Sequence, residues 1–334
     1  MKVVHFEQKY YEELLAFSKK TWPHRSEEYL GYRLFRIPER DEDNRYNLLV
    51  INDDGKIVGC ALYLPTKARI FGKEEFIKWS HDLFIEEQYR GAAGLMLLIE
   101  MNKVKSTFGF GTTPISYQIQ KELGTKFIGK ANYFLVFNIW SFKLPLVRLN
   151  LIGNPDHGKF KFPAKLKVGK NTFNKVSNAS ELKIPNNGYW SDDSVDIDFI
   201  RDEHFIRNRF FENFNNYYFY NLEVGDPSSP GECYFVIRPV IKKRFLILSI
   251  IDFRFNLKKH EQFEIILKAA SKLGRINRLP FIAVLTSYEY KRFNLYPLII
   301  RRDPQCHIIT YLPVTITHPV FVTCADSDAD FLDE

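Results

Sequence analysis

The residues with the clearest chemical potential form a glycine- and alanine-rich turn, Gln88-Tyr89-Arg90-Gly91-Ala92-Ala93-Gly94, between a predicted strand and a predicted helix. A helix N-terminus presents backbone N–H groups without partners inside the helix, at the positive end of the helix dipole. Small residues let a ligand approach that backbone, so the turn suits a pyrophosphate, and Arg90 adds a side-chain charge for the same group. The alternative interpretation is an ordinary tight turn whose small residues only permit close packing.

Alternating strands and helices over residues 1–140 must position this turn, because apolar residues there recur with strand and helix periods. The predicted strands are Val3–Phe6, Asn47–Ile51, Lys56–Leu64, Glu75–Ile85, Phe108–Gly111 and Lys126–Asn138, and the predicted helices are Gln8–Lys20, Glu27–Phe35, Gly91–Lys105 and Ile115–Leu123. Antiparallel hairpins followed by a helix, a strand, a helix and a strand predict a mixed α/β sheet.

This order of elements resembles the GCN5-related N-acetyltransferase (GNAT) superfamily. That family carries R/Q-x-x-G-x-G/A between its fourth strand and third helix, and the segment Gln88–Ala93 fits the pattern. A second register, set by Tyr89-Arg90-Gly91, puts Ala93 and Leu95 where small glycines usually lie. The segment Phe108–Gly129 also resembles the family's fifth strand, fourth helix and entry to the last strands.

The resemblance implies acetyl-CoA as cosubstrate and direct attack of an acceptor amine on the acyl group. The strand backbone at Leu83, Phe84 and Ile85 would bond the pantetheine arm. The pyrophosphate would be held by the turn, through Gln88, Arg90, Gly91, Ala92, Ala93 and Gly94.

Such a reaction needs a base for the amine proton and an acid for the thiolate. The family often uses a carboxylate on the fourth strand and a tyrosine on the fourth helix. Asp82 and His81 start the matching part of the strand, although Asp82 fits a structural ion pair equally well. The usual tyrosine position is Gln120, and Tyr117 lies one turn earlier.

The second half of the chain follows the same order of elements, with no repetition visible residue by residue. We expect a GNAT-like acyl-CoA-binding domain over 1–140, a basic connector over 141–180, a second, degenerate GNAT-like domain over 181–322 and an acidic tail over 323–334. The elements predicted in the second domain are helices at Asp202–Phe214, Glu261–Leu273 and Ser287–Phe293, and strands at Cys233–Val240, Phe245–Phe253, Phe281–Leu285 and His307–Leu312.

The second domain lacks the chemistry of the first at the corresponding turn. Its loop, Phe255–His260, contains no glycine and cannot offer a bare backbone to a pyrophosphate. The sequence therefore predicts that only the first domain binds CoA and that the second shapes an acceptor groove. Peptidoglycan aminoacyl ligases and N-myristoyltransferases are similar tandem GNAT folds.

Composition excludes several classes of protein. The 334 residues are 45% hydrophobic, which excludes a disordered chain, a collagen and a coiled coil. No signal peptide or membrane-spanning run is evident, and four scattered cysteines predict free thiols in a cytoplasmic protein without a metal site. The net charge of +7 rises to +12 without the acidic tail, and the phosphates of CoA are a sufficient partner for it. A nucleic-acid partner is not required, and a homodimer is compatible with the sequence.

Three further patterns have simpler explanations. The segment Gly153–Lys159 spells a phosphate-binding loop, but Phe160 follows it in place of Ser or Thr. The segment Asp326–Asp330 resembles the start of a calcium loop without its glycine. The aromatic run Tyr217–Tyr220 could stack nucleic-acid bases, although such density favours a core.

The sequence as a whole predicts a CoA-dependent N-acyltransferase that moves an acetyl group to an amine of a small molecule, sugar or peptide. The alternative is a tandem GNAT-fold protein without acetyltransferase activity, either an aminoacyl-tRNA-dependent ligase or a ligand-binding module.

Overall fold

The chain forms two compact units in a computed structural model. The structure describes residues 1–23, 25–37, 46–104, 106–110, 114–137, 160–182, 190, 195–223, 233–242, 245–288, 299–310, 315–316 and 320–326. Unit 1 comprises Met1–Lys130 and Gln305–Pro319, and unit 2 comprises Ala131–Pro304 and Val320–Glu334. Each unit therefore contains a segment from the opposite half of the chain. The predicted domain boundaries, after residues 140, 180 and 322, stay a prediction.

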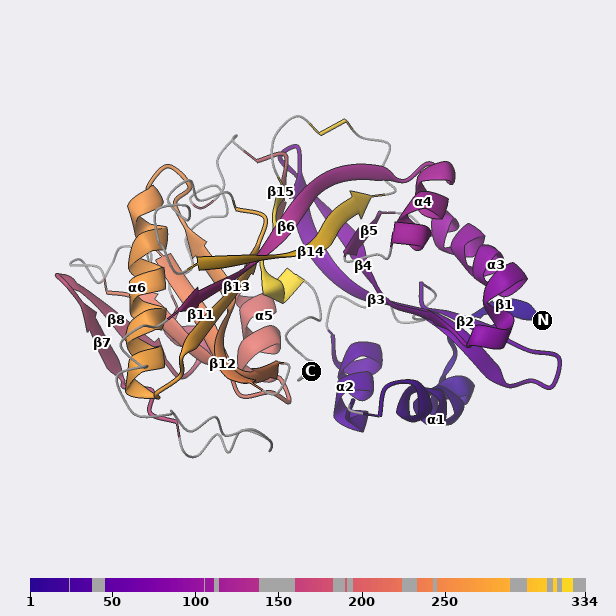
Figure 1. Cartoon of the computed structure of the whole chain (residues 1–334), viewed down its shortest axis with the longest axis horizontal. Helices are drawn as coiled ribbons and strands as arrows, with labels where there is room; N and C mark the ends of the chain where they lie inside the picture. The colour runs from indigo at the N-terminus through magenta and orange to yellow at the C-terminus, as the bar shows by residue number, and fades with distance from the viewer. Residues whose placement is uncertain are drawn as a thin grey trace. The chain divides into compact units, whose positions relative to one another are not determined.

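Unit 1 is a mixed sheet with helices on both faces (Figure 1). Its strands follow the order β1-β2-β3-β4-β5-β14, antiparallel except for the parallel pair β4 and β5. The elements are β1 (Lys2–His5), β2 (Leu48–Ile51), β3 (Ile57–Ile70), β4 (Lys73–Ile85), β5 (Thr107–Phe110) and β14 (Ile299–Thr310), with α1 (Tyr11–Thr21), α2 (Glu27–Gly31), α3 (Arg90–Lys103) and α4 (Pro114–Glu122). Helix α2 continues as a π-helix over Tyr32–Arg36.

The two faces of this sheet are separated by the alternation of side chains along a strand. In β2, Leu49 and Ile51 pack in the cluster that contains Leu14 of α1. Leu48, one position earlier, packs with Leu97 of α3 on the other face. Both faces of the strand are apolar because both are covered by a helix, which is why the whole of β2 is buried.

Unit 2 contains the remaining strands, ordered β6-β13-β12-β11-β10-β8-β7, with β15 beside β9. The elements are β6 (Lys126–Phe137, whose first residues belong to unit 1), β7 (Lys165–Val168), β8 (Asn171–Val176), β9 (Ile197–Phe199), β10 (Tyr218–Leu222), β11 (Cys233–Lys242), β12 (Phe245–Phe255), β13 (Phe281–Thr286), β15 (Val320–Phe321), α5 (Glu203–Ile206) and α6 (His260–Ile276). Helix α5 continues as a π-helix over Arg207–Phe211.

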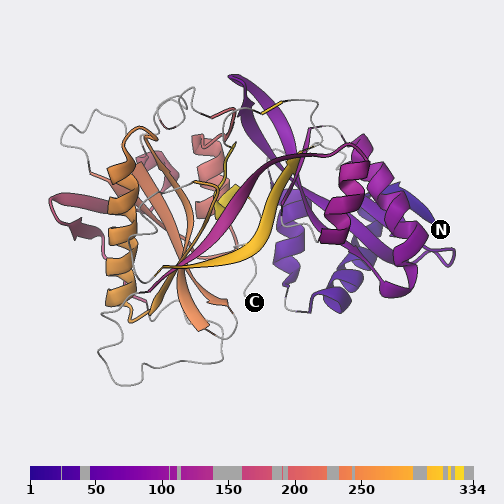
Figure 2. The ribbon, with the colours of Figure 1, turned by 45° about the horizontal axis from the view of Figure 1, so that its top comes forward.

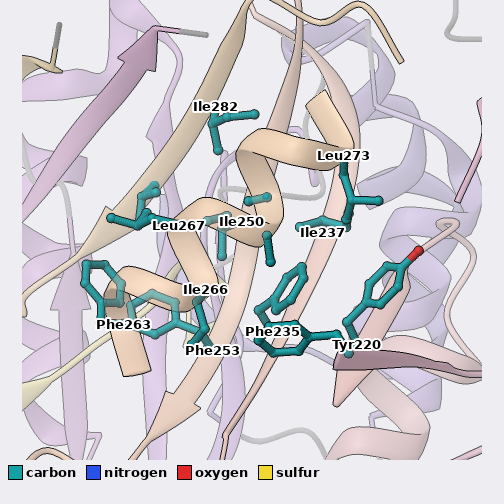
Figure 3. Packing of buried hydrophobic residues seen from close by; sticks show 14 of the residues in the cluster. Tyr220, Phe235, Ile237, Ile250, Phe253, Phe263, Ile266, Leu267, Leu273 and Ile282 are labelled. Atoms are coloured by element: carbon teal, nitrogen blue, oxygen red, sulfur yellow. The ribbon is translucent and has the colours of Figure 1, made fainter. Parts of the chain in front are cut away.

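The main core of unit 2 lies under the amphipathic helix α6, drawn in orange in Figures 1 and 2. Phe263, Ile266 and Leu273 recur at helical spacing and point at the strands (Figure 3). They meet Phe253 of β12 and Ile282 of β13, all with no more than traces of exposed surface. Burial of such side chains contributes about 1.5 to 3 kcal/mol each and fixes α6 on the sheet.

The two units repeat one topology. Each has an antiparallel hairpin, then a helix, then a strand parallel to the hairpin's second arm, then an antiparallel final strand. In unit 1 these are β3, β4, α3, β5 and β14, and in unit 2 they are β11, β12, α6, β13 and β6. The final strand of each unit comes from the other half of the chain. The predicted mixed α/β fold is confirmed.

The predicted basic connector, which was expected to contain a short strand or helix, contains the hairpin of β7 and β8, which turns at Gly169 with a φ of +60°. One expectation for the second half needs correction. The predicted acidic tail is wrong at its start, because Thr323 and Asp326 are buried and belong to the fold of unit 2. Residues 327–334, the phosphate-loop-like segment 153–159 and most of the predicted helix Ser287–Phe293 lie outside the described residues.

The aromatic run Tyr217–Tyr220 forms core rather than an exposed stacking platform. Phe219 and Tyr220 in β10 are 1% and 0% exposed, and their rings stack on those of Tyr234 and Phe235.

Candidate functional site

The carboxyl end of β4 is the backbone element that the resemblance assigns to CoA. The described pairs of the parallel β4–β5 ladder end at Ser80 and Gly109; β5 ends at Phe110, and residues 111–113 lie outside the described residues. Two positions after Ser80 the pairing with β3 shifts, so that Asp82 and Leu83 both lie opposite Ala61. This is a β-bulge, which bends a strand and increases its twist. Beyond the bulge, β4 pairs with β3 and has no ladder to β5 among the described pairs.

Asp82 adopts a left-handed backbone with a φ of +48° at this bulge. A non-glycine residue in this region is uncommon, and Asp and Asn tolerate it better than most. The end of β4 also lies close to β3, because a Cβ added to Gly59 would come within 2.8 Å of Ile85 Cγ1 and 2.9 Å of the Phe84 carbonyl oxygen. Only glycine allows that approach without a shift.

A 3₁₀ turn over Glu87–Tyr89 runs directly into helix α3 at Arg90, whose backbone N–H donates to the carbonyl oxygen of Glu87, so only the Gly91–Gly94 part of the small-residue segment lies in the first turn of α3. Gly91 and Ala92 are exposed, Gly94 is half-buried, and Ala93 is fully buried in the core. Within the described part of the chain, no side chain caps this helix end and its first turn holds no acidic residue. A Cβ placed on Gly91 would meet nothing within 4 Å. The amides of this turn are therefore accessible to an anion.

The polar residues of the turn make local contacts. The Arg90 guanidinium donates through Nε to the carbonyl oxygen of Ile85 at 3.2 Å, and its carbon lies 5.9 Å from the centre of the Phe84 ring. Gln88 is exposed and donates to Glu86 at 2.8 Å. Arg90 thus ties the start of α3 to the end of β4 and holds positive charge beside the turn.

The three strand residues predicted to face pantetheine lie directly before this turn. Leu83 is half-buried, and Ile85 is buried in the core beneath α3. Phe84 points to the opposite face, where its ring contacts those of Phe17 and Trp22 at 6.1 and 5.6 Å. The nine residues predicted for the cofactor lie within one stretch of the sequence, Leu83–Gly94, but Phe84 and Ile85 point to opposite faces of the sheet and Ala93 lies in the core, so their role in binding stays a prediction.

Asp82 lies in a buried polar cluster. Arg25 contacts its Oδ1 at 2.5 Å, Arg33 ion-pairs with its Oδ2, and the Tyr29 hydroxyl donates to Oδ2 at 3.2 Å. The side chain of Asp82 is 3% exposed. The neighbouring Cys60 thiol donates to the Asp82 carbonyl oxygen, and burial together with the Asp82 charge raises the pKa of that thiol.

The other two predicted catalytic residues are separate from this cluster. His81 is 7% exposed and stacks on the ring of Trp79. Tyr117 is half-buried on α4. Gln120, at the position where the family often has tyrosine, is 2% exposed and donates to Ser116 at 3.2 Å.

The corresponding turn of unit 2, between β12 and α6, is closed by its own side chains. The Gln262 side chain accepts from the backbone N–H of Asn256 at 3.0 Å, and the Asn256 side chain accepts from that of Lys258 at 3.0 Å. Glu261 brings a negative charge into the first turn of α6. Among the described residues no side chain caps the start of α6 either, so the two helix starts differ in the charge of Glu261 and in the size of the side chains, and CoA binding by the first domain alone stays a prediction.

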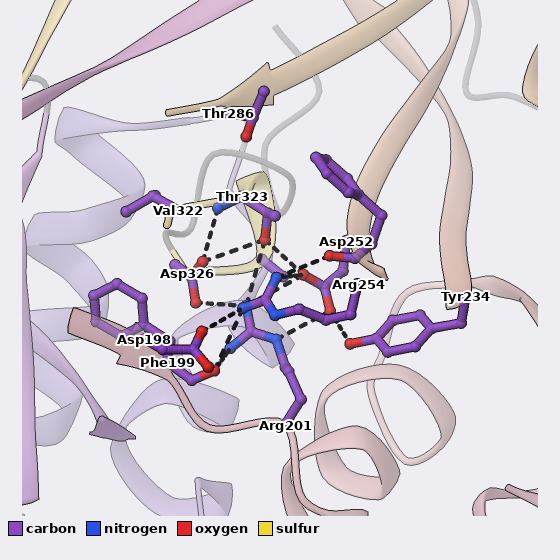
Figure 4. Close-up of polar contacts among 12 residues, drawn as sticks. Asp198, Phe199, Arg201, Tyr234, Asp252, Arg254, Thr286, Val322, Thr323 and Asp326 are labelled. Atoms are coloured by element: carbon purple, nitrogen blue, oxygen red, sulfur yellow. Dashed lines mark hydrogen bonds and ion pairs between the residues drawn. The ribbon is translucent and has the colours of Figure 1, made fainter. Parts of the chain in front are cut away.

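Unit 2 contains its own buried aspartate cluster, shown in Figure 4. Arg201 contacts Asp252 through Nε at 3.0 Å and Asp326 through Nη2 at 2.5 Å. Burial alone would raise the pKa of Asp252, but the charges of Arg201 and Arg254 hold it below its usual range. Burial and the Asp252 charge raise the pKa of Tyr234, whose hydroxyl donates to that carboxylate at 2.7 Å.

The sequence reading missed the arginines of both clusters. A repeat in the sequence could have found them: Arg25-Ser26-Glu27 precedes α2 as Arg201-Asp202-Glu203 precedes α5. In each copy a second arginine follows eight residues after the first, at Arg33 and Arg209. Arg209, however, bonds to Ala325 and Tyr217, and the second arginine beside Asp252 is Arg254. Each copy also begins with a side chain that caps the helix and ends in a π-helix.

The chain has the fold of GCN5-related N-acetyltransferases and of N-myristoyltransferase, which is the fold that the sequence resemblance predicted. The sequence matches no protein-family model, and comparison with curated proteins finds no match. The fold is similar to a GCN5-related N-acetyltransferase from Anabaena variabilis, with a TM-score of 0.57 and 11% identity over 92% of this chain and 72% of that one.

Two other solved structures cover the same share of the chain. A protein of unknown function from Enterococcus faecalis, described as a probable N-acyltransferase, has a TM-score of 0.58 and 11% identity over 92% of this chain and 71% of that one. Saccharomyces cerevisiae N-myristoyltransferase, solved with bound myristoyl-CoA, has a TM-score of 0.58 and 13% identity over 92% of this chain and 78% of that one.

The described residues include no helix with the length and apolar character needed to cross a bilayer. Within the same residues, no three His, Cys, Asp or Glu side chains gather in a metal-binding arrangement.

Proposed function

We propose that the protein is a CoA-dependent N-acyltransferase whose unit 1 binds acyl-CoA at the β4–α3 turn. The observation that carries this proposal is the start of α3, where Gly91 and Ala92 are small and exposed, a Cβ on Gly91 would meet nothing within 4 Å, and the adjoining strand end has no partner in β5 among the described pairs. The fold is consistent with it, because the similar yeast N-myristoyltransferase structure contains an acyl-CoA.

The residues of the turn fit the two polar parts of CoA. Among the described pairs, Leu83–Ile85 have no partner in β5, so backbone groups of Leu83 and Phe84 are candidates to hydrogen-bond the amides of the pantetheine arm, while the Ile85 carbonyl accepts from Arg90. The N–H groups of Gly91 and Ala92 and the Arg90 guanidinium can hold the pyrophosphate. Ala93 and Gly94 can contribute only through their backbone, because the Ala93 side chain is in the core.

We propose an acetyl group as the acyl group and an amine of a small molecule, sugar or peptide as its acceptor, in the cytoplasm. Attack of the amine forms a C–N bond and breaks the thioester C–S bond. One group must accept the amine proton and another must supply a proton to sulfur. The candidates are Asp82 and His81 at the strand end and Tyr117 on α4.

Isothermal titration with acetyl-CoA tests the cofactor proposal. We expect one binding event for the intact chain and a loss of affinity of about 100-fold or more for Gly91→Glu, because the new carboxylate blocks the helix end and repels the pyrophosphate. Ile99→Glu, which puts the same charge on an exposed position of the same helix, is the matched control and should bind normally. No binding by the intact chain, or equal binding by both variants, refutes the proposal.

One observation favours the alternative of a GNAT-fold protein without acetyltransferase activity, either an aminoacyl-tRNA-dependent ligase or a ligand-binding module. Gln120 is buried and its amide cannot supply a proton to sulfur. A free-thiol release assay over a panel of amines separates the two functions. Tight CoA binding without turnover on any amine supports the binding module.

A further inference from the structure

We propose that Asp82 is a positioning residue: with Arg25, Arg33 and Tyr29 it forms a latch that sets the bulge of β4 and thereby the strand end that binds CoA. This inference rests on the proposed function. It also decides between the two roles that the sequence leaves open for Asp82, a base or a structural partner.

The contacts of the carboxylate argue against proton transfer. Both oxygens are engaged, Oδ1 by Arg25 and Oδ2 by Arg33 and Tyr29. A proton on Asp82 would remove the charge that these guanidinium groups face inside the protein, where such a charge is hard to replace. The 3% exposure of the side chain also keeps it from an incoming amine.

The location of the latch explains what it positions. Asp82 is the residue with the left-handed backbone, and it lies within the bulge, just beyond the last pair of the β4–β5 ladder. Its partners come from the segment around α2, at Arg25, Tyr29 and Arg33. These contacts therefore connect α2 to β4 just beyond the end of the β4–β5 ladder. Asp82 lies two residues before Phe84 and three before Ile85.

Unit 2 supplies an independent observation. Asp252 lies eight residues before the start of α6, as Asp82 lies eight residues before the start of α3, and it too lies beside a bulge in its strand. Arg201, which corresponds to Arg25, binds it. The turn that follows in unit 2 lacks the small residues of the proposed CoA site. The aspartate–arginine pair is therefore shared by the two bulges and does not depend on a CoA site.

The test uses the full chain and one hydroxyl deletion in each unit. Tyr29→Phe and Tyr234→Phe each remove a hydrogen bond to the bulge aspartate, at 3.2 and 2.7 Å. We expect Tyr29→Phe to weaken acetyl-CoA binding measurably and Tyr234→Phe to leave it unchanged. Arg25→Gln, which removes an ion pair from the same latch, should weaken binding about tenfold or more. Hydrogen exchange at Leu83–Ile85 should rise in both unit 1 variants.

Asp82→Asn separates positioning from catalysis, because asparagine tolerates the left-handed backbone and removes only the charge. Positioning predicts weaker CoA binding and faster exchange at Leu83–Ile85. A loss of turnover with unchanged CoA affinity and unchanged exchange would identify Asp82 as the base and overturn the inference.

Failure of the proposed function gives a different result. In that case the wild-type chain does not bind acetyl-CoA, and the CoA-binding role of the latch falls with it. Exchange at Leu83–Ile85 in the unliganded protein still decides the structural part. Unchanged exchange in Arg25→Gln, Tyr29→Phe and Asp82→Asn would show that the latch does not set the strand end.

Discussion

The turns β4–α3 and β12–α6 have the same length but carry different side chains. In each, four residues separate the last strand residue, Ile85 or Phe255, from the first helix residue, Arg90 or His260. The two connections differ in backbone, because a 3₁₀ turn over Glu87–Tyr89 precedes α3 and Lys259 before α6 has a ψ of 68° where Tyr89 has 0°. They also differ in the side chains of the first helical turn.

Position by position, the first turn of α3 is small where that of α6 is polar or large. Gly91 corresponds to Glu261, Ala92 to Gln262, and Ala93 to Phe263. In α6 these side chains are used internally, Gln262 for the loop backbone and Phe263 for the core. The comparison teaches that connections of one length can carry either small exposed residues, where we propose an anion site, or side chains that bind the loop backbone and fill the core.

The largest expected effect is the loss of stability when Asp252, the unit 2 counterpart of Asp82, is replaced. Asp252→Ala should lower the free energy of unfolding by about 3 to 5 kcal/mol, because it leaves the buried guanidinium groups of Arg201 and Arg254 without that counter-charge. Urea denaturation followed by circular dichroism measures this loss. Glu203→Ala, which removes only an exposed ion pair with Arg207, should change stability by less than about 1 kcal/mol. Equal effects of the two variants would show that the cluster does not stabilise unit 2.

Gly59→Ala tests the other half of the comparison, the strand end in unit 1. The added methyl group would clash with Ile85 and with the Phe84 carbonyl, and we expect a destabilisation of about 1 to 3 kcal/mol. Because the displaced groups belong to the predicted pantetheine site, acetyl-CoA affinity should fall too. Gly55 already has a positive φ and nothing near its missing Cβ, so Gly55→Asn is a suitable control. Full CoA affinity in a folded Gly59→Ala chain would remove the strand end from the site.

Acid should weaken unit 2 through Asp252. The pKa of this group in the folded protein lies below its ordinary value of 3.8, so its contribution to stability is present above that value and is lost as the pH falls below it. The unfolding free energy of the wild type should therefore fall below about pH 4 more steeply than that of Asp252→Asn. Chemical denaturation between pH 3 and pH 6 compares the slopes, and parallel slopes would contradict the prediction.

The smallest expected effect comes from opening the closed turn. Gln262→Ala gives α6 the residue type of Ala92 and should cost about 1 kcal/mol, because the Asn256 N–H loses its acceptor. Titration with acetyl-CoA should still show one site, since Glu261 and Phe263 remain. A second binding event would mean that Gln262 alone closes the turn. The matched change Ala92→Gln in α3 should weaken CoA binding.

Local signals account for the parts of the fold that were predicted. Most helices and strands of the first half agree with the structure within a few residues, because apolar periodicity and turn residues such as Gly55 are local. The turn Gln88–Gly94 was found for the same reason. In the second half β7, β8, β9, β10 and β15 were not located. The exchange of final strands was not predicted, because pairing of β14 with β5 joins residues about 200 positions apart and leaves no local pattern.

The clusters of charged residues show the same limit. Asp82 and Asp252 were each seen within a strand, and the arginine before each α2-like helix was not connected to them. Asp326 was placed in a solvated tail because five acidic residues without a base resemble one. Its burial depends on Arg201, 125 residues earlier, which no pattern in the tail reveals.

By itself, the sequence determined the element order, the GNAT resemblance and the small residues that open the start of α3, because each of these is encoded in neighbouring residues. Only the tertiary structure decided which groups Asp82 and Asp252 face, where the β4–β5 ladder ends, and which unit β6 and β14 each complete. These depend on contacts between distant segments, and the free energy of burying a charge is settled by partners that sequence proximity does not supply.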